Sequence, residues 1–175
     1  MKSILPPFTF FILLISFSFF AAAQKPATAL EMNDHFTSIT DSLYKRGIAW
    51  GKKFNEAYQT KNFSTLTEVR KQLELFIEKK RKEVLLLPDI GGSEDLRLAM
   101  LDFLAFEAKM AKEAFIPLEK FNSSSSDAEI KKAIEALQEQ SKGENLQIQK
   151  LTAAQQAYAK KNGFTITGDD EEGDQ

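Results

Sequence analysis

Apolar side chains recur at helical spacing along most of the chain. Between Leu30 and Thr60 an apolar or small residue returns every seven positions, and others follow three or four positions later, so all of them share one helix face. These positions are Phe36, Leu43, Trp50 and Ala57, with Ile39, Gly47 and Phe54 between them. The pattern predicts a long first helix. Gly47 falls on its apolar face, where we expect a neighbour to approach closely because no side chain stands in the way.

A second apolar stripe, from Leu66 to Leu87, predicts the next helix. We expect the Ser64 hydroxyl to cap its first turn. Pro88 ends it, because the residue before a proline is pushed out of the helical conformation. The last four residues before the proline, 84–87, are all apolar, which is too many for one helix face. Some of them therefore pack under the following loop, or they form an exposed apolar patch that marks a partner site.

A glycine pair predicts a tight turn before the third helix. Gly91 and Gly92 supply the backbone freedom that the turn needs, and Ser93 is the expected helix cap. The apolar face of this helix contains Leu96, Met100, Phe103, Leu104, Met110 and Ala114. Pro117 lies inside the same pattern, so we expect a kink or an early end near Phe115.

A serine-rich linker, residues 122–127, precedes the fourth predicted helix. Ser126 and Glu129 have the spacing of a capping box, and Gly163 suits the left-handed backbone that ends a helix. Gly143 marks a possible bend. The apolar stripe contains Ile130, Ile134, Leu137, Ile148, Leu151 and Tyr158.

Four amphipathic helices joined by short connections predict an all-α fold, an antiparallel up-down four-helix bundle. We expect one continuous apolar seam shared by the four helices, with no reactive group at its centre.

The N-terminal residues have the pattern of a secretory signal peptide. Lys2 supplies the positive start, residues 8–20 the apolar middle, and Ala21-Ala22-Ala23 the small residues of a cleavage site. The apolar run is shorter than the roughly 20 residues of a spanning helix; retention as an anchor is the alternative. We therefore expect a cleaved signal peptide over 1–23, a bundle domain over 24–166, an acidic disordered tail over 167–175, and export to the periplasm, the cell surface or the medium.

The charge balance argues against a nucleic-acid partner. The chain has 23 Lys and Arg against 25 Asp and Glu, and five of the acidic residues stand in the last seven positions. The rest of the chain is close to neutral, without the excess of basic residues that nucleic-acid binding requires.

No strong signature of metal, cofactor or catalytic chemistry is present. His35 is the only imidazole, and with Glu31 it gives two potential ligands, whereas di-metal bundle sites use two Glu-x-x-His pairs. A haem held by His35 and Met100 or Met110 would need a deep pocket. The chain has no Cys and no Gly-x-Ser-x-Gly elbow, and the Gly91-Gly92 turn lacks the Lys-Ser/Thr of a phosphate loop. We therefore expect no cofactor and no enzymatic activity.

The strongest candidate for a partner site is the end of the second helix. A basic run is followed there by apolar residues that flank a proline. The candidate residues are Lys79, Lys80, Arg81 and Lys82, with Leu86, Leu87, Pro88 and Ile90. Glu78 and Glu83 flank the basic run, so a solvated helix face with internal ion pairs is the competing interpretation.

Two segments carry a resemblance. Residues 90–115, "IGGSEDLRLAMLDFLAFEAKMAKEAF", and residues 151–164, "LTAAQQAYAKKNGF", resemble a family of small exported bacterial surface proteins of uncharacterised function. The resemblance implies one helical domain behind a signal peptide. It implies no catalytic residue.

The sequence thus gives three functional hypotheses. The first is a non-enzymatic interaction module of the cell envelope or surface, with an unknown envelope protein or a surface polymer as its partner. The second is a carrier that holds an apolar small molecule or haem between the helices, and an enzyme ranks third. The carrier hypothesis rests on the phenylalanines of the helices, namely Phe36, Phe54, Phe76, Phe103, Phe106 and Phe115.

Overall fold

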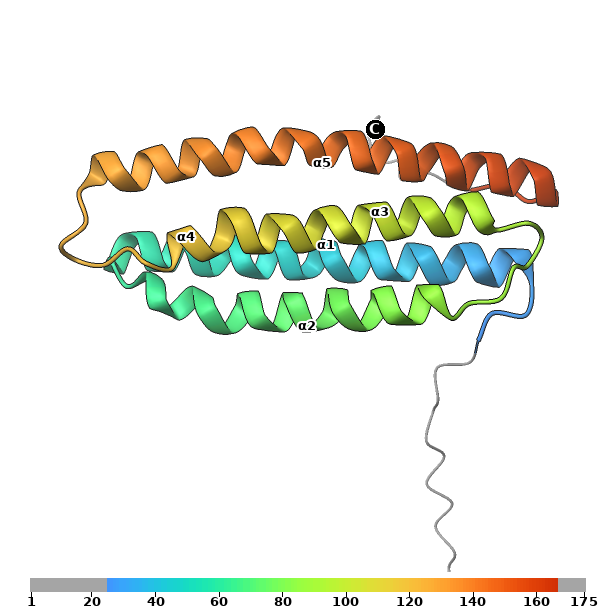
Figure 1. Ribbon diagram of the computed structural model, residues 1–175, viewed down its shortest axis with the longest axis horizontal. Helices are drawn as coiled ribbons and strands as arrows, with labels where there is room; N and C mark the ends of the chain where they lie inside the picture. Colours follow the sequence, from blue (N-terminus) through green and yellow to red (C-terminus); the bar gives the residue numbers. More distant parts are fainter. Residues whose placement is uncertain (1–24, 167–175) are drawn as a thin grey trace, which may run out of the picture.

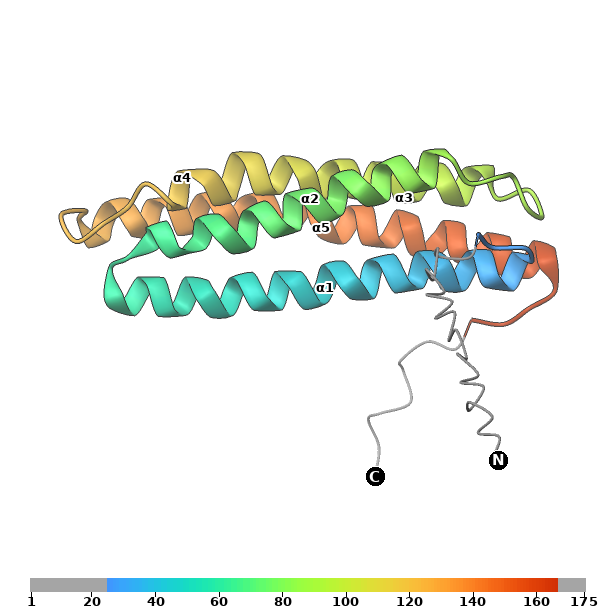
Figure 2. The same cartoon turned by 90° about the horizontal axis from the view of Figure 1, so that it is seen from below.

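The computed structural model describes residues 25–166, and within this range the fold is entirely helical. Four long helices lie side by side along the long axis of the molecule (Figures 1 and 2). They are α1 (Ala29–Thr60), α2 (Leu66–Leu85), α3 (Glu94–Met110) and α5 (Asp127–Asn162), with the short elements η1 (Phe63–Thr65), η2 (Ala111–Phe115) and α4 (Ile116–Leu118) between them. The predicted all-α class and the four helices are confirmed. The predicted signal peptide and acidic tail lie outside the described residues.

Local hydrogen bonds set the ends of α1 and α5. The predicted capping box of α5 is present: Glu129 N donates to Ser126 Oγ at 3.2 Å, and Ser126 N donates to the Glu129 carboxylate at 2.9 Å. Gly163 ends this helix with φ of 73°, as predicted. A second capping box, between Thr28 and Glu31, begins α1. These pairs satisfy backbone N–H groups that have no partner inside the helix.

Of the two other predicted caps, Ser64 is wrong, whereas Ser93 occupies the predicted N-cap position of α3 but its side chain makes no capping hydrogen bond. Helix α2 is preceded by the 3₁₀ turn η1, in which Ser64 Oγ donates to Asn62 Oδ1 instead of capping. Ser93 has φ of −80° and ψ of 6°, not the extended backbone that a capping side chain needs. Ser93 N instead donates to Asp89 Oδ1 at 2.5 Å, which fixes the turn before α3. The predicted glycine turn is confirmed, since Gly91 and Gly92 both have positive φ.

The expected irregularity near Phe115 takes the form of a π-helical segment. Helix α3 passes into η2, Ala111–Phe115, and then into the single turn α4, which contains Pro117. The wider π turn stands directly before the turn with Pro117, which has no backbone N–H to donate. The chain therefore continues in the same direction before the loop to α5 (Figure 1).

A buried ion pair joins α2 to the end of α4. The Arg70 residue is 8% exposed, and its guanidinium donates to the Glu119 carboxylate and, at 2.5 Å, to Glu74. Thr67 Oγ1 adds a hydrogen bond of 2.7 Å to Glu119. Because both charges have several partners, the pair remains stable in the interior.

The buried apolar side chains of the interior form two clusters. The larger cluster contains Met32, Phe36, Ile39, Leu43, Leu73, Ile77, Val84, Leu87, Leu96, Met100, Phe103, Leu104, Leu151 and Tyr158. The smaller contains Trp50, Ala57, Phe63, Leu66, Leu118 and Ile130, and in it the Trp50 ring stacks on Phe115 at 3.9 Å between ring centres. The partly buried Phe115 packs against both clusters, so the predicted single seam is a pair of clusters linked by one aromatic ring.

Candidate functional site

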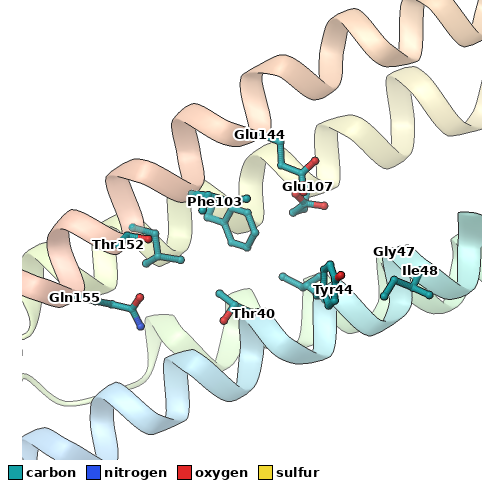
Figure 3. A pocket seen from close by; sticks show the side chains of 12 residues that line it. Thr40, Tyr44, Gly47, Ile48, Phe103, Glu107, Glu144, Thr152 and Gln155 are labelled. Carbon is teal, nitrogen blue, oxygen red and sulfur yellow. The ribbon is translucent and has the colours of Figure 1, made fainter. Parts of the chain in front are cut away.

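A pocket of about 510 Å³ opens between α1, α3 and α5, near the middle of the molecule (Figure 3). Its volume is within the range of small-molecule sites, about 300–1,000 Å³. Helix α1 contributes Thr40, Leu43, Tyr44, Gly47 and Ile48, helix α3 contributes Phe103 and Glu107, and helix α5 contributes Glu144, Ile148, Leu151, Thr152 and Gln155.

Contacts between α1 and α5 lie on both sides of the pocket. Gln155 reaches Thr37 at 3.4 Å on one side, and on the other side Lys61 forms an ion pair of 2.5 Å with Asp127. Between these points the two helices leave the pocket open. Apolar side chains around it are exposed, with Tyr44 72% and Ile48 55% accessible on α1.

Gly47 and Gly143 have different surroundings: Gly47 borders open space, and Gly143 borders an aromatic ring. A Cβ at Gly47 would meet no atom within 4 Å, so the predicted close approach at Gly47 is wrong and the space belongs to the pocket. The close approach occurs at Gly143, where a Cβ would lie 2.9 Å from Cε2 of the Phe106 ring. Helix α5 is continuous through Gly143, where the sequence predicted a bend. This glycine gives room to an aromatic ring of α3 instead.

Two carboxyl groups face the pocket from neighbouring helices. Figure 3 shows Glu107 of α3 and Glu144 of α5 extending into the same space. The Oε1 atom of Glu107 is buried and has no hydrogen-bond partner. Burial, with a smaller contribution from the charge of Glu144, raises the pKa of Glu107 to about 7. Burial also raises the pKa of Glu144. The expectation of no reactive group at the centre of the bundle is therefore wrong, because two ionisable carboxyl groups lie there.

The rest of the lining is apolar or neutral and polar. Leucine, isoleucine and Phe103 side chains form the walls, and Thr40, Thr152 and Gln155 add neutral hydrogen-bonding groups. Among the residues that line the pocket, none is Lys, Arg or His. Within residues 25–166 no three potential metal ligands of the His, Cys, Asp or Glu type come together. The pocket can thus offer a ligand apolar contact, neutral hydrogen bonds and two carboxyl groups.

The residues considered for metal or haem binding lie elsewhere. His35 Nε2 is 2.9 Å from Glu83 Oε1, where α1 meets α2. Burial lowers the pKa of His35, and Glu83 opposes the shift. Met100 and Met110 are buried core residues, and neither lines the pocket. The pocket therefore provides no pair of axial ligands from this set.

The fold buries part of the predicted partner site and leaves the rest exposed. Leu86 is 73% exposed, whereas Leu87 is 5% exposed and belongs to the larger apolar cluster. Pro88 is exposed, and Ile90 packs against the same cluster while partly covered. Only part of the apolar segment is accessible to a partner.

Two of the four basic residues beside this segment form ion pairs within α2. Lys80 pairs with Glu83 at 2.9 Å and Lys82 with Glu78 at 2.6 Å, as the competing interpretation expected. Lys79 and Arg81 are exposed on the same helix. The structure therefore leaves two of the four cations outside these internal pairs.

One residue of the pocket stands out in the sequence by its position. Glu107 stands four residues after Phe103 and three before Met110, so it falls within the apolar stripe of α3. A carboxyl group at such a position is either buried or faces a cavity. Its partner Glu144 could not be found in this way, because α5 is mostly polar in that segment.

Comparison of the chain with protein-family models, with curated proteins and with solved structures finds no match. The resemblance to small exported surface proteins stays a prediction. None of the helices between residues 25 and 166 combines the length and the apolar character that a membrane crossing requires.

Proposed function

We propose that this protein is an exported, non-enzymatic binding protein that holds a small amphiphilic molecule in the pocket between α1, α3 and α5. The observation that carries the proposal is a cavity of about 510 Å³ with apolar walls, into which an otherwise unpartnered carboxyl group projects. Small-molecule sites combine these features, a mostly apolar surface with a few polar groups that fix orientation. The cavity favours the carrier hypothesis over the interaction module, which needs no interior space.

The proposal includes an antiparallel up-down arrangement of the helices and export behind a cleaved leader. The arrangement is supported by ties between segments far apart in sequence. Tyr158 Oη near the end of α5 donates at 2.7 Å to the carbonyl of Ile90, just before α3, and Lys61 after α1 pairs with Asp127 at the start of α5. Export is supported by the pattern of residues 1–23, and places the protein in the periplasm, on the cell surface or in the medium.

A second candidate function is docking to an envelope partner through the end of α2. It is supported by two adjacent exposed leucines, Leu85 at 63% and Leu86 at 73%. Lys79 and Arg81 are exposed nearby, so an acidic segment of an envelope protein or an acidic surface polymer would match this surface in charge. Leu86→Asp tests this candidate: loss of retention in the envelope by a folded variant supports it, and unchanged retention contradicts it.

Partly filling the pocket should weaken ligand binding without disturbing the fold. The variant is Gly47→Leu, which places a side chain in space that the pocket now occupies. Gly51→Leu is the matched control, because it lies one turn further along α1, where an added Cβ would also meet no atom within 4 Å, and does not line the pocket. Both changes remove a helical glycine, so each should stabilise α1 by several tenths of a kcal/mol, up to about 1 kcal/mol.

The binding measurement uses the neutral fluorescent probe N-phenyl-1-naphthylamine. We expect Gly47→Leu to weaken binding of the probe about tenfold or more, while Gly51→Leu binds like the unmodified protein. Equal binding by all three proteins would contradict the assignment of the pocket.

A further inference from the structure

The carboxyl groups in the pocket discriminate between classes of ligand. Glu107 and Glu144 reach the cavity from two different helices, and the Oε1 atom of Glu107 is buried without a partner. An unpaired buried carboxylate is costly, because it has lost its water and gained nothing in return. A ligand with a positive charge beside Glu107 offsets the free-energy cost of the ionised carboxylate, whereas an anionic ligand increases this cost.

We propose that the natural ligand is an organic cation, a protonated amine on an apolar body, with its ammonium group beside Glu107 and Glu144. This inference rests on the proposed function and assigns the ligand class of the same pocket. The apolar body would contact Phe103, Leu151 and Ile148, which line the same cavity. The rings of Phe103 and Tyr44 can add cation–π attraction for an ammonium group.

A metal ion fits this pocket less well than an organic cation. Calcium takes six to eight oxygen ligands, and magnesium needs an octahedron of oxygens. Within the described part of the chain no three acidic, His or Cys side chains gather into such a set. The pocket is also much larger than a single ion, and most of its walls are apolar.

Binding of the amine is coupled to protons. The titratable groups that line the pocket are Glu107 from α3, Glu144 from α5 and Tyr44 from α1. Burial raises the pKa of both carboxyl groups, so each is protonated over a wider pH range than an exposed glutamate. An ammonium ion stabilises the ionised carboxylates and lowers their pKa values, so binding releases protons near neutral pH. Affinity for the amine therefore falls as the pH decreases below about 7.

The test compares three probes with the same eight-carbon tail: octylamine, 1-octanol and octanoate. The ammonium group of octylamine, like that of Lys, stays protonated between pH 5 and 8. Titration calorimetry at pH 8 should give an affinity for octylamine about tenfold or more above that for octanol, with octanoate the weakest. At pH 5 the preference for octylamine over octanol should shrink. Calorimetry in two buffers of different ionisation enthalpy, at pH 6.5, should show proton release with octylamine and none with octanol.

Variants test whether the two carboxyl groups cause the preference for octylamine and the proton release. The double variant Glu107→Gln/Glu144→Gln should keep octanol binding and lose both the preference for octylamine and the proton release. Asp102→Asn, an exposed charge removal on α3, is the control and should behave like the unmodified protein.

Two outcomes would overturn the inference in distinguishable ways. Equal binding of octanol and octylamine, or tighter binding of octanoate, contradicts the cation while leaving a ligand pocket in place. Binding of no probe, together with no effect of Gly47→Leu on N-phenyl-1-naphthylamine, contradicts the pocket function as well.

Discussion

Replacing Glu107 with glutamine should raise the free energy of unfolding at pH 8 by about 3 kcal/mol and leave it nearly unchanged at pH 4. The reason is the difference between the pKa of about 7 in the folded protein and the ordinary value of 4.5. Below pH 4.5 the carboxyl group is neutral in both states and costs nothing. Between pH 4.5 and 7 the unfolded chain ionises this carboxyl group while the folded protein keeps it protonated, so stability decreases over this range. Above pH 7 the folded protein must hold an ionised carboxylate in a partly dry cavity, and the full cost remains. Glutamine keeps the shape of the neutral acid and avoids this cost.

The measurement is urea unfolding of both proteins across pH 4–8. Removing the exposed carboxylate of Asp102 on the same helix is the control. That change should alter the free energy of unfolding by no more than about 0.5 kcal/mol at any pH. If Glu107→Gln and the unmodified protein lose stability in parallel as the pH rises, the Glu107 carboxyl group is not held in a costly environment.

Replacing Leu87 with aspartate should unfold the protein or destabilise it by about 4 kcal/mol or more. Leu87 is 5% exposed in the larger apolar cluster, so the variant leaves a cavity and buries a carboxyl group without a partner. Leu86 is 73% exposed, and Leu86→Asp should change the stability by no more than about 0.5 kcal/mol. Aspartate at two adjacent leucine positions should thus change the free energy of unfolding by very different amounts, and the difference is a large fraction of the stability of a typical domain.

Thermal unfolding followed by circular dichroism separates the two leucine variants. The expected result is a loss of helix at room temperature or a strongly lowered melting temperature in Leu87→Asp, with an unchanged transition in Leu86→Asp. Similar transitions in the two variants would show that the end of α2 is not anchored in the interior as the structure has it.

The helices could be predicted from the sequence because their signals are local. The apolar stripe of α1, the Ser126–Glu129 capping box and the left-handed Gly163 each depend on residues within one or two turns. The caps of α2 and α3 could not be predicted as reliably. Whether a serine caps a helix depends on its backbone angles, and Ser93 is held by Asp89 in a conformation that does not cap.

The pocket could not be predicted because it depends on the spacing between helices. Both Gly47 and Gly143 lie inside predicted helices. The residues next to each glycine do not indicate that Gly143 faces an aromatic ring and that Gly47 faces open space. The same limitation explains the two leucines at the end of α2, since an apolar run does not show which of its members the neighbouring helices cover. The position of Glu107 in an apolar stripe was the one available clue.

The central claim is that the middle of this helical protein holds a pocket with a protonatable carboxyl pair. Carbon-13 NMR titration of the glutamate side-chain carboxyl carbons tests it most directly, with Glu107→Gln and Glu144→Gln used for assignment. We expect one carboxyl group to titrate with a pKa of about 7, a signal that Glu107→Gln removes, and the signal of Glu144 to titrate above the ordinary value of 4.5. Titration of every glutamate carboxyl at or below 4.5 would contradict the account.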